Sequence, residues 1–296
     1  MISKLPNTYL QQREWQTMTN DKKIKLEYAS HPDLRGKIAI VTGATGFLGQ
    51  HLCEALARNG VNICLADTSS DSIRRLEEYL RNEFGIQCTG LSCDISNPED
   101  VIKLVDQCRN SLGEIAVLFN NAAAKTANMI DFYQKYENYK LETWRNVMSV
   151  NIDGMFLVSQ AVGNSMINSN LGGVMVQTAS IYGVLAPDHR IYTNDSVTKT
   201  NPAPAVYSVS KAAVIGLTNY LSAYWANRNI RVNSISPGGI FNSQDELFVK
   251  SYSERVPMKR MGTPQEFVNG ALFLASEDSS YITGQNLILD GGLSSW

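Results

Sequence analysis

Cysteine and histidine are scarce in this 296-residue sequence, which limits its capacity for disulfide bonds and metal binding. It contains five cysteines, three histidines and no C-x-x-C pair. An odd number of cysteines without metal-ligand spacing predicts reduced, packed thiols and argues against a disulfide framework or a zinc site. The histidines, at positions 31, 51 and 189, are scattered along the chain. We therefore predict no bound metal.

A marked excess of charge and long apolar runs are also missing. Lys plus Arg number 26 against 28 for Asp plus Glu, and no basic run stands out. Nucleic acids and anionic membrane surfaces attract concentrated Lys and Arg, so neither is expected as a partner. No apolar run reaches the ~18 residues that a transmembrane helix requires. The start of the chain lacks the apolar core of a signal peptide, so the expected location is the cytoplasm.

From residue 37 onward, short apolar runs alternate with longer stretches of helical periodicity. Nearly continuous apolar strands separated by helices are typical of a parallel sheet covered on both faces. We predict an α/β fold, namely a single doubly wound Rossmann domain with a parallel sheet of about seven strands. The expected strands are 37–42, 61–66, 86–92, 115–119, 173–178, 230–235 and 286–289, and the expected helices are 47–59, 70–84, 98–111, 141–168, 205–228 and 264–275.

Three segments fall outside this alternation. Residues 1–35 form an N-terminal extension, so the Rossmann-type catalytic domain is predicted to span 36–296. Residues 186–204 form a long polar loop, and residues 241–262 form an insertion before the last helix. Both follow strands at their carboxyl ends, where open α/β sheets bind ligands, and long loops are often functional.

A glycine-rich turn follows the first expected strand. The run Thr-Gly-Ala-Thr-Gly-Phe-Leu-Gly places Gly43 in the tight turn, Gly46 at the start of the helix and Gly49 where helix and sheet pack closely. Such a turn exposes backbone N–H groups at a helix N-terminus to a pyrophosphate. The predicted cofactor contacts of this turn are Gly43, Thr45, Gly46, Phe47, Leu48 and Gly49.

An acidic residue, Asp67, ends the second expected strand. A carboxylate there accepts hydrogen bonds from the ribose hydroxyls of NAD and repels the 2′-phosphate of NADP. No Lys or Arg stands at Ala44, Thr45 or Thr68 to bind that phosphate, so NAD is the predicted cofactor. Further contacts are expected after the third strand, at Asp94 and Ile95, and after the fourth, at Asn121 and Ala122.

Tyr207 and Lys211 begin a long amphipathic helix, four residues apart and so on one face. A phenol of pKa ~10 is a poor base at neutral pH. A nearby ammonium and the positive nicotinamide ring would lower that pKa and permit proton exchange with a carbinol or carbonyl oxygen. Ser180, after the fifth strand, would orient the substrate oxygen, and Asn151 would hold a water near Lys211.

These motifs, in this order, resemble the short-chain dehydrogenase/reductase family over residues 36–292. They include Asn-Asn-Ala-Ala, Ser-Val-Asn-Ile-Asp-Gly, Tyr-x-x-x-Lys and Ile-Thr-Gly-Gln-Asn-Leu-Ile-Leu-Asp-Gly-Gly. The resemblance implies a catalytic tetrad of Asn151, Ser180, Tyr207 and Lys211. It also implies a nicotinamide pocket lined by Pro237, Gly238 and Ile240, and a homodimer or homotetramer formed through the long helices.

Substrate identity is less directly encoded. The glycine spacing G-x-x-G-x-x-G and the Ser-Ile-Tyr-Gly segment resemble relatives that act on nucleotide sugars. The wider run through Ala-Pro-Asp is similar to a bacterial subgroup linked to flagellin modification and nonulosonic (sialic-like) sugars. Both resemblances imply hydride transfer between NAD and a secondary alcohol or ketone on a sugar, amino sugar or sugar phosphate. Candidate substrate contacts are Tyr182, Arg190 and Lys199.

Two alternatives remain open at this stage. One is a dehydrogenase of apolar alcohols such as steroids, although the polar loop 186–204 is a poor lid for an apolar substrate. The other is a catalytically idle NAD-binding assembly protein, which an intact tetrad argues against.

Overall fold

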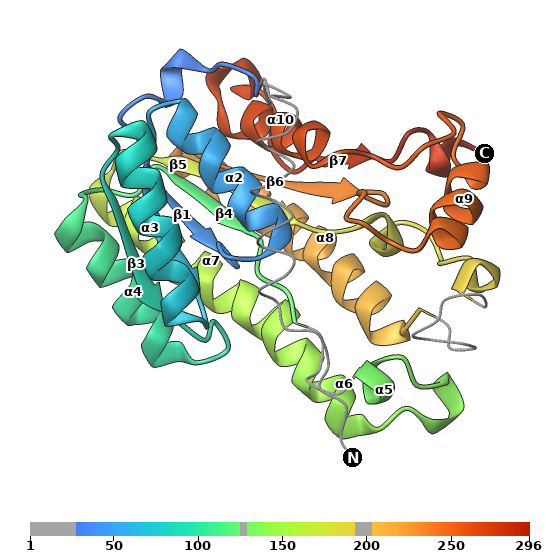
Figure 1. The fold of residues 1–296 in the computed structure, drawn as a ribbon. Helices are drawn as coiled ribbons and strands as arrows, with labels where there is room; N and C mark the ends of the chain where they lie inside the picture. Colours follow the sequence, from blue (N-terminus) through green and yellow to red (C-terminus); the bar gives the residue numbers. More distant parts are fainter. Residues whose placement is uncertain (1–27, 125–128, 193–202) are drawn as a thin grey trace.

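The computed structural model describes residues 28–124, 129–192 and 203–296. Its centre is a seven-stranded sheet in the order β3-β2-β1-β4-β5-β6-β7, with every neighbouring pair parallel (Figure 1). The predicted doubly wound α/β fold and its seven strands are therefore confirmed. The strands are β1 (Ile38–Thr42), β2 (Asn62–Asp67), β3 (Cys88–Ser92), β4 (Val117–Asn120), β5 (Gly173–Thr178), β6 (Ile230–Pro237) and β7 (Asn286–Leu289).

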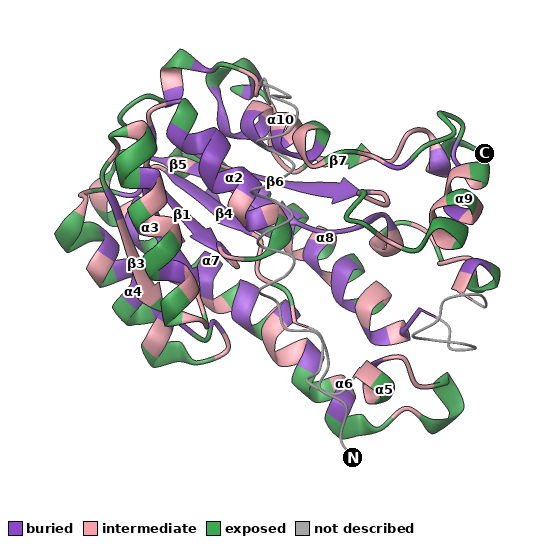
Figure 2. Ribbon diagram, viewed as in Figure 1, coloured by how far each residue is buried: buried purple, intermediate pink, exposed green. Residues whose placement is uncertain are grey.

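Helices cover both faces of the sheet. One face packs against α2 (Phe47–Arg58), α3 (Ser70–Phe84) and α10 (Pro264–Ala275). The other packs against α4 (Pro98–Ser111), α7 (Met155–Ser169) and α8 (Ala205–Trp225). Most of the sheet is buried between these two layers, which explains why the central strands β1, β2 and β4 are mostly apolar (Figure 2).

Local signals set several helix boundaries where the sequence predicts them. The side chain of Ser69 caps α3, and Asn97 followed by a proline begins α4. Thr263 and Glu266 form a reciprocal capping box at the start of α10. These residues satisfy backbone N–H groups that would otherwise lack partners at the helix ends.

The long helix predicted over 141–168 is interrupted. It consists of α6 (Leu141–Met148), a π-helical turn at Ser149–Gly154, and α7. Two helices were not predicted, namely the short α5 (Met129–Phe132) and α9 (Glu246–Arg255) within the insertion 241–262. Asp245 caps α9 by accepting N–H bonds from its first turn, a signal that was present in the sequence.

The described end of the predicted N-terminal extension packs on the domain. Leu34, in the 3₁₀ turn Pro32–Leu34, is fully buried in the core. Tyr28 Oη lies 3.2 Å from His51 Nδ1 on α2, and the His31 backbone N–H donates to Asn59 Oδ1 at 2.7 Å. Residues 28–35 are therefore attached to the same hydrophobic core as the sheet.

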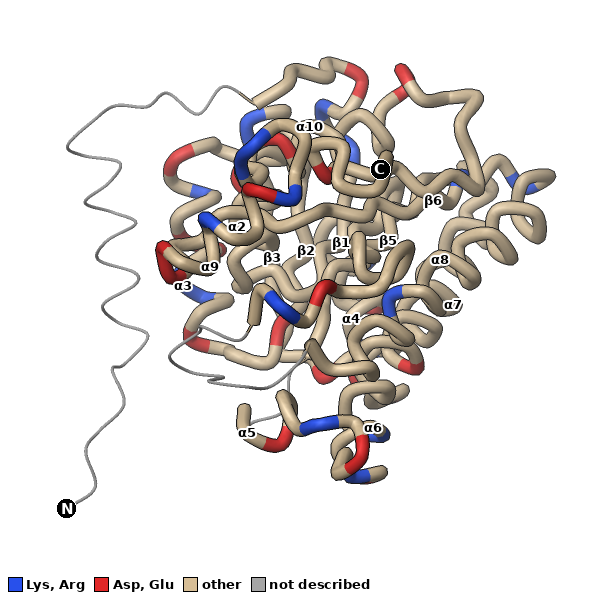
Figure 3. The backbone as a smooth tube through the Cα atoms, turned by 90° about the vertical axis from the view of Figure 1, so that its right-hand side faces the viewer, with Lys and Arg blue, Asp and Glu red and all other residues tan. Residues whose placement is uncertain are grey.

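Charges of both signs are interspersed along the described chain (Figure 3). All five cysteines are buried and unbridged. Within the described ranges, no His, Cys, Asp and Glu side chains cluster so as to hold a metal ion. Among the same residues, no helix combines the length and the apolar character needed to span a bilayer.

Candidate active site

The predicted cofactor turn joins β1 to α2 and leaves little room for side chains. Gly43 has a φ of +62°, a conformation that residues with a side chain rarely adopt. A Cβ on Gly43 would lie 2.9 Å from the Ala122 Cα, and one on Gly49 would clash with the Gly43 carbonyl oxygen. The turn therefore requires glycine at both positions, and its tight cradle fits the close backbone approach of a pyrophosphate.

A threonine that the sequence analysis passed over ties this turn to the next strand. Thr42 Oγ1 accepts N–H bonds from Asn121 and Ala122, both at 3.0 Å, and donates to Asn120 Oδ1 at 3.2 Å. Asn121 Nδ2 also donates to the Thr42 carbonyl at 3.3 Å. The predicted contacts Asn121 and Ala122 therefore lie beside the glycine turn, and Thr42 determines their position.

Asp67 also lies at this turn, as expected from its place at the end of β2. Its Oδ2 accepts the Thr45 N–H at 3.0 Å and its Oδ1 accepts the Thr68 N–H at 2.8 Å. The half-buried carboxylate thus stands at the edge of the cradle, where a ribose hydroxyl could donate to it.

The predicted contacts after β3 differ from one another in exposure. Asp94 is exposed, and its Oδ1 accepts bonds from the Ser96 backbone at 2.9 Å and from the Ser96 hydroxyl at 2.7 Å. Ile95 is buried, and its side chain leaves no room for a Cβ on Gly154. Ile95 thereby links this loop to the π-helical turn.

Ser180, Tyr207 and Lys211 converge from β5 and α8. Tyr207 shares a hydrogen bond with Ser180, while Lys211 Nζ lies 5.8 Å from the centroid of the Tyr207 ring. Lys211 is only 2% exposed, and its ammonium donates to the Thr178 carbonyl at 2.7 Å. Tyr207 and Lys211 share one face of α8, as their i, i+4 spacing predicts, and Ser180 approaches them from the end of β5. A grouping of this kind could offer one substrate oxygen both a hydroxyl ligand and a proton donor.

Burial alters the pKa values of both groups. It lowers the pKa of Lys211 to about 8, because the charged ammonium is desolvated. Burial also raises the pKa of Tyr207, and the hydrogen bond with Ser180 acts in the opposite direction. In the chain alone, desolvation is therefore the larger effect on Tyr207, whereas the expected lowering of its pKa included the positive nicotinamide ring as well as the ammonium.

Asn151 lies in the π-helical turn and is 1% exposed. Its Oδ1 accepts the Ala124 N–H at 2.8 Å, and its Nδ2 donates to Ser210 Oγ at 3.1 Å. Ser210 Oγ in turn donates to the Tyr207 carbonyl at 2.8 Å. Asn151 therefore joins the loop after β4 to the helix of Tyr207 and Lys211, and π-helical turns of this kind are frequent at functional sites.

The segment Pro237-Gly-Gly-Ile240 leaves β6 at the same edge of the sheet. The Gly238 N–H donates to the Leu289 carbonyl at 2.8 Å, and the Gly239 N–H donates to the hydroxyl of Tyr252 on α9. Ile240 pairs with Gly262 in an isolated parallel bridge. The predicted nicotinamide wall is thus held by β7 on one side and by α9 on the other.

The predicted substrate contact Tyr182 belongs to a separate small apolar cluster, which we call the wall cluster. Tyr182 and Tyr192 share an O–H···O bond of 2.7 Å, and the Tyr192 ring lies 5.6 Å from that of Phe248 on α9. The cluster therefore joins the segment after Ser180 to α9 and the C-terminus. Its buried members are Ile181, Ile191, Tyr252, Val256, Met261 and Leu293.

Of the two basic residues predicted to contact the substrate, the structure describes only Arg190. The side chain of Arg190 is 89% exposed and is bound through Nε and Nη2 to the two oxygens of Asp188, at 2.9 and 2.8 Å. Its guanidinium is thus already engaged by a carboxylate, which the sequence analysis did not consider. Lys199 lies outside the described residues.

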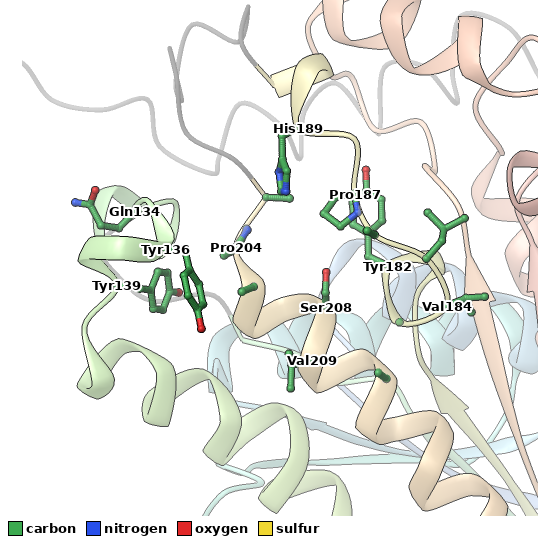
Figure 4. A pocket seen from close by; sticks show the side chains of 16 residues that line it. Gln134, Tyr136, Tyr139, Tyr182, Val184, Pro187, His189, Pro204, Ser208 and Val209 are labelled. Atoms are coloured by element: carbon green, nitrogen blue, oxygen red, sulfur yellow. The ribbon is translucent and has the colours of Figure 1, made fainter.

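A cavity of about 480 Å³ lies next to these residues, along the outer face of the start of α8 (Figure 4). Tyr182 and the following residues to Pro187 form one side, and Ser208 and Val209 form its floor. Gln134, Tyr136 and Tyr139 complete it from a segment that the sequence analysis did not single out. Tyr207 and Lys211 are not among its lining residues, although their neighbours Ser208 and Ala212 are, so the cavity adjoins these two candidate catalytic residues without containing them.

Comparison with known proteins agrees with this geometry. Residues 43–294 match a protein family described as enoyl-(acyl carrier protein) reductase. D-Arabinitol 2-dehydrogenase (ribulose-forming) of Scheffersomyces stipitis is 33% identical over 283 residues, covering 89% of this chain and 95% of the relative. The 3-oxoacyl-[acyl-carrier-protein] reductase of Aquifex aeolicus is 30% identical over 264 residues, covering 88% and 98% of the two chains.

Solved structures give the same result. NAD⁺-bound xylitol dehydrogenase is 32% identical with a TM-score of 0.76, covering 88% of this chain and 99% of that one. A gluconate 5-dehydrogenase from Burkholderia cenocepacia, in complex with NADP and tartrate, is 28% identical with a TM-score of 0.78 and coverages of 90% and 98%. Taken with the glycine turn and the Ser-Tyr-Lys grouping, these matches establish that the chain belongs to the short-chain dehydrogenase/reductase family of oxidoreductases.

Proposed function

We propose that this protein is an NAD-dependent dehydrogenase that interconverts a secondary alcohol and a ketone on a sugar, amino sugar, sugar phosphate or related polyol. The convergence of Ser180, Tyr207 and Lys211 carries this proposal, since it supplies a hydrogen-bond donor and a mobile proton to one oxygen. The polyol and sugar-acid dehydrogenases among the relatives support the polar substrate class.

The residues at the glycine turn fit a bound dinucleotide. Gly43, Gly46 and Gly49 would hold the pyrophosphate, and Asp67 would accept bonds from the adenosine ribose. Asp94, Ile95, Asn121 and Ala122 would border the adenosine half. When bound, the nicotinamide accepts or donates the hydride.

NAD is the preferred cofactor in this proposal. The Asp67 carboxylate would repel a 2′-phosphate, and no Lys or Arg occupies positions 44, 45 or 68. The NAD⁺-bound xylitol dehydrogenase is a relative with that choice, whereas the gluconate 5-dehydrogenase was solved with NADP. Because these relatives differ in cofactor, the proposed preference for NAD rests on Asp67 and on the residues at positions 44, 45 and 68 of this chain.

The protein's residues divide the remaining work. Ser180 Oγ would donate to the substrate oxygen and fix its position, and Tyr207 Oη would give or take the proton at that oxygen. Lys211, held by the Thr178 carbonyl, would favour the anionic form of the phenol and bind the nicotinamide ribose. Asn151 would preserve the alignment of these groups through Ser210.

Association into a homodimer or homotetramer is also part of the proposal. The outer faces of α7 and α8 carry large exposed side chains, including Phe156, Tyr220 and Tyr224 at 46%, 62% and 63% exposure. The two tyrosine rings stack at 5.7 Å. Exposed aromatic surface on packed helices is typical of subunit interfaces, and sedimentation analysis of the purified chain would test this.

We further propose a cytoplasmic enzyme with a catalytic domain at 36–296 and an extension at 1–35. The narrower assignment is to the subgroup linked to flagellin modification and nonulosonic sugars, for which the run from Ser180 to Asp188 is the support. Location would be tested by cell fractionation, and the subgroup by assay of nonulosonic-sugar precursors.

A substrate panel tests the proposed activity. The purified protein should oxidise D-arabinitol, xylitol or D-gluconate with NAD⁺ faster than a steroid alcohol, and should reduce the matching ketoses faster than a 3-oxoacyl thioester. Preference for the steroid or the thioester would refute the sugar assignment. Tight NADH binding with no turnover across the panel and the subgroup precursors would favour an idle NAD-binding protein.

A further inference from the structure

One carboxylate at the edge of the wall cluster binds two arginines from different parts of the chain. Asp188 Oδ2 lies 2.8 Å from Arg190 Nη2 and 3.1 Å from Arg255 Nε. Asp188 lies six residues after Tyr182, in the segment 181–192, whereas Arg255 is the last residue of α9. The carboxylate therefore connects the segment 181–192 directly to α9.

The burial of this bridge sets it apart from an ordinary surface ion pair. The side chains of Asp188 and Arg255 are 10% and 29% exposed, whereas those of the Asp71–Arg74 pair on α3 are 73% and 68% exposed. Exposed pairs contribute little, while partly buried pairs are screened less by solvent and salt. Asp188 is the carboxylate that pairs with Arg255, through Nε, and Arg255 Nη1 is buried and has no hydrogen-bond partner among the described residues.

Around the bridge, neighbouring contacts hold the same segments together. The Trp296 indole N–H donates to the Arg255 carbonyl at 3.0 Å, which attaches the C-terminus to the end of α9. Tyr252 of α9 accepts the Gly239 N–H at the predicted nicotinamide wall. Figure 1 shows α9 beside the C-terminus, at the end of the sheet toward which β6 points. The position of Tyr182 therefore depends on α9, and α9 contacts the nicotinamide side of the site.

We infer that Asp188 is a positioning residue that, through Arg255, holds Tyr182 and its segment against α9 and so shapes the substrate side of the active site. This inference rests on the proposed function for its catalytic consequence, but the bridge itself does not. The inference also restricts Arg190. Because Asp188 binds its guanidinium, Arg190 can bind a substrate anion only in competition with that carboxylate.

Hydrogen–deuterium exchange on the full chain tests the bridge without any substrate. Asp188→Asn and Arg255→Gln should each accelerate amide exchange in 181–192 and 246–255. The double variant should match Asp188→Asn, because removal of the carboxylate already removes the pair with Arg255. Asp71→Asn is the matched control and should leave both segments unchanged. Unaltered exchange in the two bridge variants, or additive effects in the double variant, would overturn the inference.

Kinetics then separate positioning from general loss of stability. For whichever polyol is turned over, Asp188→Asn and Arg255→Gln should raise KM on the order of tenfold while kcat and the Kd of NADH change less than about twofold. Equal loss in kcat and NADH binding would indicate a merely structural role. If exchange changes as expected but no sugar or polyol is a substrate, the bridge stands and the proposed substrate class fails.

A comparison of neutral and anionic substrates separates the two arginines. If the bridge acts as inferred, Asp188→Asn raises KM for D-arabinitol and D-gluconate alike. If Arg190 instead binds the substrate carboxylate and Asp188 only competes with it, Asp188→Asn lowers KM for D-gluconate alone. The second result would overturn the positioning role.

Discussion

The cofactor turn and the wall cluster lie at the same carboxyl edge of the sheet, but different interactions hold them. The turn is shaped by backbone geometry within a few residues, with Gly43 in a left-handed conformation and Gly49 against a carbonyl. The wall cluster is held by side chains from three separate segments, joined by the Asp188–Arg255 pair and by the bond from Trp296 to the Arg255 carbonyl. We therefore expect substitution of Gly43 or Gly49 to disrupt the turn. Residues of the wall cluster should tolerate substitution better, as long as the contacts between its segments are kept.

Between these two regions lie the proposed catalytic groups, whose loss should have the largest effect. Tyr207→Phe should lower turnover by at least ~100-fold, because the phenolic proton is lost while the ring packing remains. NADH affinity, measured by fluorescence titration, should stay near the wild-type value. Near-normal turnover of the variant would remove Tyr207 from its proposed role. Lys211→Ala should weaken both NADH binding and turnover.

The strict sterics of the turn can be tested on a matched pair of glycines. Gly49→Ala should destabilise the fold or the cofactor site by roughly 1–3 kcal/mol, because the added Cβ clashes with the Gly43 carbonyl oxygen. Gly216→Ala on α8 is the control, since a Cβ there meets nothing within 4 Å. Thermal unfolding and NADH titration would measure both variants. Equal tolerance of the two would contradict the cradle geometry.

Cofactor choice tests whether the turn alone sets specificity. The wild type should prefer NAD(H) to NADP(H) by about tenfold or more, equivalent to ~1.4 kcal/mol. Asp67→Ser with Thr68→Arg should narrow or reverse the preference, because repulsion is removed and a phosphate partner is added. Steady-state kinetics with both cofactors would measure it. Equal use of the two by the wild type would mean that Asp67 does not contact the ribose.

The pH dependence of alcohol oxidation depends on the buried Lys211. Because burial lowers its pKa to about 8, the Tyr207–Lys211 pair should lose its first proton near that value. The kcat/KM for oxidation should rise about tenfold per pH unit below the break and level off above it, since oxidation needs the deprotonated pair. The break should disappear in Lys211→Ala. A wild-type profile that is flat between pH 6 and 9 would contradict this assignment.

The smallest expected effect falls on the polar loop of the substrate side. Arg190→Ala should raise KM for an anionic substrate only several-fold, because a substrate anion must compete with Asp188 for the guanidinium, and should leave NADH affinity unchanged. Lys199→Ala serves as the companion variant. The salt dependence of KM should be weaker in Arg190→Ala than in the wild type. If both variants leave KM alone, the anionic-substrate hypothesis loses its support.

The fold was predicted from the sequence to a large extent, because the signals for strands and helix starts are local, and local signals also placed the candidate site residues at the carboxyl edge of the sheet. Apolar runs bounded by glycine and proline locate the seven strands, and caps such as Thr263 and Asn97 locate helix starts. An i, i+4 pair on one helix, such as Tyr207 and Lys211, shares a face in any such fold. These features depend on residues close together in the chain.

Contacts between segments distant in the sequence were revealed only by the tertiary structure. No local pattern showed that Asp188 pairs with Arg255, that Thr42 anchors the loop after β4, or that α9 supports Tyr182. The balance of pKa shifts at Tyr207 also needed the structure, because desolvation depends on everything packed around the phenol. Local sequence thus specified the strands, the glycine turn and the spacing of Tyr207 and Lys211, whereas packing across the chain shaped the wall cluster and the electrostatics of the proposed site.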